Sequence, residues 1–168
     1  MKQLYLVRHA KSSWENHLLA DIDRPLSTKG KRDAPIIGNI LKEKKIMPDI
    51  IISSNAKRAF TTAKIIAEKL GYSHKIEVNK SIYEATTQNL LDVITSIDDK
   101  FNSAMIFGHN PGLTVLTGFI TNEFVNNMPT SAVAIIELSV NFWKDVNTAS
   151  GKLIGFEFPK KYSVGNRH

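Results

Sequence analysis

Near its amino terminus the chain reads Leu4-Tyr5-Leu6-Val7-Arg8-His9-Ala10, and this stretch decides the fold. Four apolar or aromatic residues in a row predict a short buried β-strand. A guanidinium and an imidazole then stand side by side where that strand must end. Because ligands of an open α/β sheet bind outside the carboxyl ends of its strands, Arg8 and His9 are candidate site residues. The alternative is an ordinary edge strand that ends in a solvated Arg-His pair.

The composition is that of a globular protein. The chain has 168 residues, of which 42% are hydrophobic, and this length suffices to bury one core. No apolar run approaches the roughly 18 residues of a membrane span, and no signal-peptide pattern is present. We therefore expect one domain over residues 1–168 with a frayed tail over 162–168, a cytoplasmic location and no membrane partner. The absence of cysteine excludes disulfides, thiolate chemistry and zinc sites built from cysteine.

The net charge of the chain favours anionic partners. It is +6, with a pI near 9.5, so phosphorylated substrates, acidic proteins and nucleic acid are all compatible with the surface. Most of the excess is lysine spread along the chain, without long basic blocks or an aromatic RNA-binding signature. A solvated lysine-rich surface therefore explains the charge better than a nucleic-acid groove, and we expect no specific nucleic-acid partner.

Strands and helices alternate along most of the chain. After the first strand, the patterns predict strands at 50–52, 75–78, 104–107, 132–138 and 153–158, and helices at 27–41, 56–70, 89–97 and 113–120. Pro35 lies inside the first helical pattern, where we expect a kink or a later start of the helix. The last two strands could pair antiparallel through the turn-rich segment 147–151. The alternation predicts an α/β fold: a three-layer α/β/α sandwich with a mostly parallel central sheet.

Basic side chains stand at three strand-to-helix junctions. Arg8 and His9 follow the first strand, Arg58 lies in the first turn of the helix after strand 50–52, and His109 follows strand 104–107. In a parallel sheet these junctions share one edge. Two arginines and two histidines there predict a pocket for a phosphoryl dianion, because guanidinium groups bind its oxygens in bidentate fashion. A neutral imidazole can attack phosphorus and carry the group covalently, and nearby arginines disfavour its protonation.

With these residues in place, the chain resembles the histidine phosphatase superfamily, whose fold is phosphoglycerate-mutase-like. The resemblance is carried by four motifs in the right order, over about two thirds of the chain: Leu6–Ala10, Arg24–Ser27 with Gly30, Ser53–Ala59 with Thr62 and Ala63, and Gly108–Pro111. These motifs look most like the small SixA-type phosphohistidine phosphatase branch. Ala10 stands where many larger members have glycine, which agrees with that branch.

The resemblance implies a role for each site residue. His9 would be the phosphorylated nucleophile, Arg8 and Arg58 would hold the phosphoryl oxygens, and His109 would be the second histidine of the pocket. The family's proton donor is usually an acid after a mid-chain strand; Glu84 is the matching residue, with a surface glutamate of no catalytic part as the alternative. Ser12 is in register with a phosphate-binding serine of the mutase branch. Glu15 lies where that branch has an asparagine, so phosphate contacts from this loop stay open.

The substrate expectation follows from the length of the chain between Arg58 and His109. Core elements use all of it, which leaves no room for the lid that family members acting on sugar phosphates carry there. We therefore expect a phosphatase that needs no metal or cofactor and favours phosphohistidine on proteins, since an imidazole leaving group needs little protonation. The alternatives are broad phosphomonoesterase activity on small metabolites and a non-catalytic phosphate-binding module. The sequence leaves the oligomeric state open.

Overall fold

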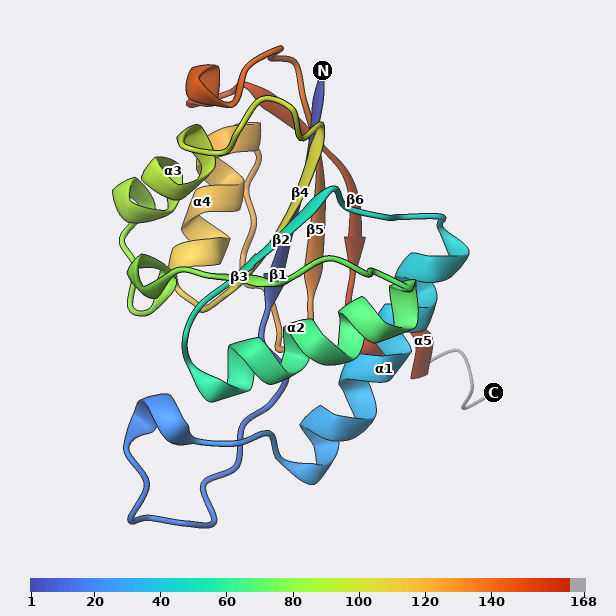
Figure 1. The fold of residues 1–168 in the computed structure, drawn as a ribbon, viewed down its shortest axis with the longest axis vertical. Helices are drawn as coiled ribbons and strands as arrows, with labels where there is room; N and C mark the ends of the chain where they lie inside the picture. Colours follow the sequence, from blue (N-terminus) through green and yellow to red (C-terminus); the bar gives the residue numbers. More distant parts are fainter. Residues whose placement is uncertain (164–168) are drawn as a thin grey trace.

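The computed structural model describes residues 1–163 and contains one sheet between two layers of helices (Figure 1). The described strands are β1 Lys2–Arg8, β2 Ile50–Ser53, β3 Glu77–Val78, β4 Ser103–Gly108, β5 Val133–Leu138 and β6 Gly151–Glu157. They are ordered β3-β2-β4-β1-β5-β6. The first four strands run parallel, and β5 pairs antiparallel with both β1 and β6. The predicted mostly parallel sheet and the antiparallel final pair are both confirmed.

The helices cover both faces of this sheet, as Figure 1 shows. They are α1 Thr28–Glu43, α2 Lys57–Leu70, α3 Thr87–Thr95, α4 Gly112–Thr121 and the short α5 Pro159–Ser163, with single 3-10 turns η1 Asp21–Asp23, η2 Lys80–Ile82 and η3 Trp143–Asp145. Helices α1 and α2 pack together on one face, and α3 and α4 pack on the other.

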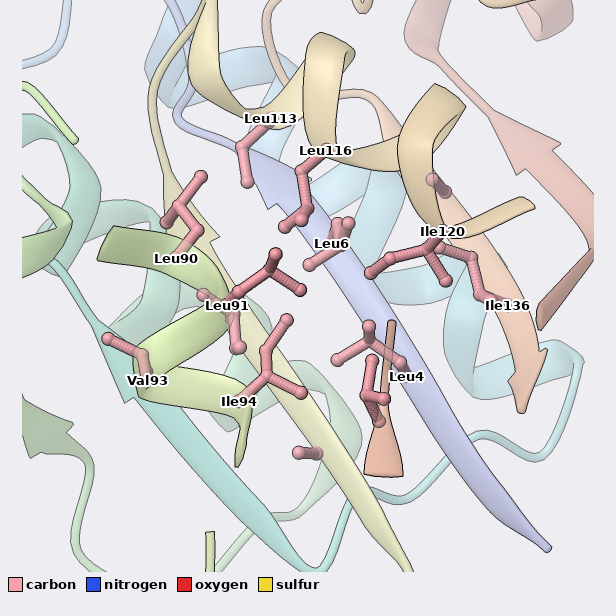
Figure 2. Packing of buried hydrophobic residues seen from close by; sticks show 14 of the residues in the cluster. Leu4, Leu6, Leu90, Leu91, Val93, Ile94, Leu113, Leu116, Ile120 and Ile136 are labelled. Carbon is pink, nitrogen blue, oxygen red and sulfur yellow. The ribbon is translucent and has the colours of Figure 1, made fainter. Parts of the chain in front are cut away.

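The side-chain alternation of β1 divides the core between the two faces. Leu4 and Leu6 point toward α3 and α4, whereas Tyr5 and Val7 point toward α1 and α2. Figure 2 shows the first cluster, in which the two leucines meet residues of the facing helices: Leu90, Leu91, Val93 and Ile94 of α3, and Leu113, Leu116 and Ile120 of α4. Because successive residues of a strand face opposite sides, one continuous apolar run supplies both halves of the core. The expected three-layer sandwich is thereby confirmed.

Helix α1 begins directly after its N-cap residue, Ser27. The Ser27 hydroxyl oxygen accepts a hydrogen bond from the Gly30 amide, 3.1 Å away, and so caps the first turn. Gly30 also allows the chain to pass closely, since a Cβ built there would lie 2.2 Å from the Lys11 carbonyl oxygen. Pro35 lies inside the helix, so the later start considered from the sequence is wrong.

The strand pairing brings the candidate junctions together. Arg8 pairs in register with Gly108, so His9 and His109 follow two adjacent strands at the same level. Ser53 pairs with Phe107 on the other side of β4, which places Ser54 beside the same edge. The carboxyl ends of β1, β2 and β4 thus form one rim, from which the chain of β1 continues into the long blue loop of Figure 1.

A short helix, α5, follows β6. Tyr162 and Ser163, which we expected in a frayed tail, belong to α5, and the Tyr162 hydroxyl donates a hydrogen bond to the buried carboxylate of Glu157. Residues 164–168 of the expected tail lie outside the described residues. In the described part of the chain, none of the helices has the length and apolarity that a membrane crossing requires.

Candidate active site

His9 is buried and its ring is held in one tautomer. The ring is just past β1, and its Nδ1 lies 2.7 Å from the Ala10 carbonyl oxygen. A carbonyl only accepts hydrogen bonds, so Nδ1 carries the proton and Nε2 keeps its lone pair. The backbone around the ring is fixed as well, because the His9 amide donates to Gly108 and the Ala10 amide donates to the Thr62 hydroxyl. His9 is therefore a rigidly placed imidazole with a free nucleophilic nitrogen.

The surroundings of His9 keep it neutral. Burial is the largest cause of a lowered pKa, which falls from 6.5 to about 4. The positive charges of Arg58 and Arg8 act in the same direction, while the hydrogen bond to Ala10 acts against them. Near pH 7 the ring is uncharged, as a nucleophile must be.

His109 lies beside His9, as the sequence predicts. The two ring centroids are 5.1 Å apart, and the Nε2 atom of His109 lies 2.8 Å from the hydroxyl oxygen of Ser54. Burial lowers the pKa of His109 to about 3, with repulsion from His9 and Arg58 as further causes. Its Nδ1 atom is buried and has no hydrogen-bond partner among the described residues. The contact of Ser54 with His109 depends on the pairing of β2 with β4, which no local sequence pattern reveals.

Arg8 and Arg58 flank His9 and retain free donors. The NH1 group of Arg8 donates to the Met128 carbonyl, and its Nε is buried without a partner in the described part of the chain. Arg58 is 8% exposed, and its NH1 and NH2 groups donate to the backbone oxygen and to the carboxylate of Asp21. Each guanidinium has five N–H bonds, so both arginines keep donors for a further anion. The structure thus brings Arg8, His9, Arg58 and His109 to one rim.

The loop over residues 11–25, called the 11–25 loop below, adds side chains that the sequence did not identify as site residues. Arg24 donates to the Ser13 carbonyl, the Asp21 carboxylate and the Ser12 hydroxyl oxygen. Its guanidinium carbon also lies 3.0 Å from the centroid of the Trp14 ring. The loop has no periodic sequence pattern, so the sequence does not predict which side chains Arg24 contacts.

His9, its two flanking arginines and part of the 11–25 loop line one pocket at the rim, and His109 lies beside His9 without being a lining residue. The pocket has a volume of about 510 Å³, and its lining consists of Arg8, His9, Lys11, Ser12, Trp14, Arg24, Arg58, Asn127, Pro129 and Thr130. Ser12 thus faces the pocket with its oxygen engaged by Arg24, which leaves its hydroxyl proton free to donate. Four positive charges and a neutral imidazole make the pocket suited to a tetrahedral anion.

Glu84 lies apart from the other candidates, which either line the pocket or, like His109, have a ring beside that of His9. It is exposed, has a backbone φ of 52°, and is not among the residues that line the pocket. Its neighbour Tyr83 is closer to the site, with a ring centroid 5.6 Å from that of His109. The structure therefore brings the Tyr83 ring beside that of His109, whereas Glu84 lies outside the pocket lining.

Acidic residues and histidines do not gather into a metal centre in residues 1–163. No group of three or more His, Asp or Glu side chains there is placed to hold a metal ion.

Comparison with known proteins places the chain in a family. The family model of the histidine phosphatase superfamily, branch 1, matches residues 4–128. An uncharacterised protein of Mycobacterium tuberculosis is 26% identical over 164 residues, which cover 92% of this chain and all of that protein. Phosphoglycerate mutase 1 of Saccharomyces cerevisiae is 44% identical over 71 residues, which cover 41% of this chain and 29% of the mutase.

Solved structures agree with this assignment. A protein of Agrobacterium tumefaciens assigned as the phosphohistidine phosphatase SixA has a TM-score of 0.80 at 26% identity, covering 94% of this chain and 98% of its own. The protein histidine phosphatase SixA in complex with tungstate has a TM-score of 0.82 at 20% identity, covering 95% and 98%. These likenesses establish the phosphoglycerate-mutase-like fold and, with the family match, support phosphatase activity. The chain belongs to branch 1 of the histidine phosphatase superfamily.

Proposed function

We propose that this chain hydrolyses phosphoryl groups through a covalent phosphohistidine at His9 and that its favoured substrate is phosphohistidine on proteins. The observation that carries the proposal is the state of His9: a buried neutral ring whose Nδ1 proton is held by Ala10 and whose Nε2 lone pair is free. A site built only to bind phosphate needs donors, and it gains nothing from an imidazole held uncharged among arginines.

The reaction has two displacement steps in this proposal. In the first, Nε2 of His9 forms a bond to phosphorus, and the bond from phosphorus to the substrate nitrogen breaks; the electron pair stays with the departing imidazole, which takes a proton from solvent water. In the second, water attacks the phosphoryl group on His9, the P–N bond breaks, and inorganic phosphate leaves. Arg8 and Arg58 bind the equatorial oxygens in both steps, with His109 and the Ser12 hydroxyl as further donors.

The substrate preference is supported by the openness of the rim. The connections between α2 and β4 consist of the short β3, η2 and α3 and their turns, with no inserted segment over the pocket. A phosphoryl group that projects from another protein can therefore reach His9. The exposed position of Glu84 fits the same substrate, because a departing imidazole needs less help from an acid than an alkoxide does. Independence of metal ions and a cytoplasmic location remain parts of this proposal.

A second enzyme activity has one observation in its favour. The pocket volume of about 510 Å³ falls within the roughly 300 to 1,000 Å³ that small-molecule sites occupy. Broad phosphomonoesterase activity on metabolites is therefore the competing function.

The test is a substrate panel run on the wild type and on two variants whose folding is checked by circular dichroism. The panel holds a phosphohistidine protein, a sugar phosphate and a nucleoside monophosphate, each with and without a chelator. His9→Ala should lose all turnover, and His74→Ala, which changes an exposed histidine outside the pocket, should keep it. A labelled donor should leave an acid-labile phosphoryl group on His9.

Three results would contradict parts of the proposal. Turnover that survives in folded His9→Ala removes the mechanism. A strong preference for a monophosphate ester removes the substrate assignment. Binding of phosphate without label or turnover identifies a phosphate-binding module.

A further inference from the structure

Asp21 joins three parts of the site through its carboxylate and backbone oxygens. Its backbone oxygen and Oδ2 accept hydrogen bonds from NH1 and NH2 of Arg58, at 2.8 and 3.0 Å. Its Oδ1 accepts from NH1 of Arg24 at 3.2 Å, and its Oδ2 also accepts from the Tyr83 hydroxyl at 2.6 Å. One residue of the 11–25 loop thereby links helix α2, the loop itself and the segment after β3.

The contact with Arg58 is bidentate and fixes how that guanidinium lies. Two of the five N–H bonds of Arg58 point to Asp21, one from each terminal nitrogen, and within residues 1–163 the other three have no hydrogen-bond partner. Because the guanidinium group is planar and rigid, fixing two N–H bonds fixes the direction of the rest. Arg58 is nearly buried, with a side chain 10% exposed, whereas the Asp21 side chain is 47% exposed.

The carboxylate remains charged at any pH at which the enzyme would work. The hydrogen bond from Tyr83 is the largest cause of a lowered pKa for Asp21, which falls to about 2, and the bond from Arg58 adds to the effect. Asp21 is therefore an acceptor near neutral pH and has no proton to give to a leaving group.

We propose that Asp21 is a positioning residue that holds the Arg58 guanidinium in the orientation that binds the phosphoryl group, with Tyr83 holding Asp21 in turn. This inference rests on the proposed function, which assigns Arg58 to the phosphoryl oxygens. It assigns a function to the 11–25 loop, because the contact of Asp21 with α2 holds Arg58 beside His9.

The 3-10 turn supplies a matched control. Asp23 lies two residues from Asp21, is exposed, and makes no hydrogen bond or ion pair through its side chain in the described part of the chain. Asp21→Asn and Asp23→Asn each remove one negative charge from the same turn. Charge removal alone should strengthen anion binding slightly in both variants. Only Asp21→Asn also disturbs Arg58.

The experiment measures the affinity of each variant for tungstate by calorimetry and kcat and KM on a phosphohistidine peptide. We expect Asp21→Asn to lower tungstate affinity and kcat/KM by about 10- to 100-fold, as a misdirected binding group does. We expect Asp23→Asn to stay within about twofold of the wild type, since it changes only a solvated charge. Asp21→Glu should recover part of the loss, because it restores a carboxylate that can accept from both Arg58 and Tyr83.

A second experiment distinguishes the positioning of Arg58 by Asp21 from a general stabilisation of the 11–25 loop by Asp21. In an Arg58→Ala background, Asp21→Asn should cost less than about threefold, because the group on which it acts is gone. Should Asp21→Asn fail to fold, Tyr83→Phe removes a single hydrogen bond to Asp21 and should still lower tungstate affinity, again only when Arg58 is present. An equal loss with and without Arg58, or equal behaviour of the Asp21 and Asp23 variants, overturns the inference.

Tungstate affinity and peptide turnover test the positioning role of Asp21 and the proposed phosphatase activity separately. Loss of tungstate affinity in Asp21→Asn supports the positioning role even if no substrate is turned over. Turnover of the peptide with unchanged tungstate affinity in Asp21→Asn overturns the role and leaves the phosphatase assignment intact.

Discussion

The buried state of His9 makes the stability of the protein sensitive to mild acid. The folded state holds the pKa of this ring near 4, against 6.5 in the unfolded chain, mainly through burial. As the pH falls below about 6.5, the unfolded chain binds a proton that the native ring does not take up until near pH 4. Stability is therefore complete above this range and is lost on acidification. The loss from His9 alone is about 2 kcal/mol between pH 7 and pH 5.

His109 should add a loss of similar size over the same interval, because burial lowers its pKa to about 3. Asp21 titrates lower still and contributes only in stronger acid. Urea unfolding at the two pH values measures the total, and the buried Trp143 provides a fluorescence signal. In His9→Gln the loss should shrink by about half, since one of the two rings is gone. His74→Gln, at an exposed position outside the pocket, is the control and should keep the wild-type loss.

A free energy of unfolding that stays constant between pH 7 and pH 5 would refute the reasoning. So would an unchanged loss in His9→Gln, because it would mean that the fold does not hold the His9 ring neutral.

Three further predictions test single contacts. Ser54→Ala removes the hydroxyl that lies 2.8 Å from Nε2 of His109 and should lower kcat by about tenfold in a variant of native circular dichroism; an unchanged kcat would show that this contact does not orient the ring. Glu84→Gln should change kcat on a phosphohistidine peptide by less than about threefold, since an imidazole leaves readily, and a much larger loss would identify Glu84 as the proton donor. Gly30→Ala places a Cβ 2.2 Å from the Lys11 carbonyl oxygen and should lower the free energy of unfolding by about 1–3 kcal/mol in urea titration, whereas a neutral result would mean that the loop moves aside without cost.

The distant contacts of the 11–25 loop could not be predicted from the sequence. Asp21 forms an ion pair with its near neighbour Arg24 in the same loop. The same carboxylate also holds Arg58 and accepts from Tyr83, residues 37 and 62 positions away. Irregular loops have no hydrophobic period, so nothing local predicts which distant side chains they meet.

The chemistry-bearing positions were determined by the sequence alone. Short apolar runs between turn-forming residues predict buried strands, and Arg8, His9 and His109 lie at the ends of two such runs. The local sequence pattern is enough to predict these strand ends, because the formation of a strand and the alternation of its side chains depend on residues close in sequence.

The tertiary structure alone decided that β4 lies between β2 and β1, which puts the two histidine rings 5.1 Å apart with Ser54 beside them. It also decided the burial that lowers the pKa of His9 to about 4. Both depend on the pairing of strands about a hundred residues apart and on the two helical layers that exclude water. These long-range contacts form only when the whole chain has folded.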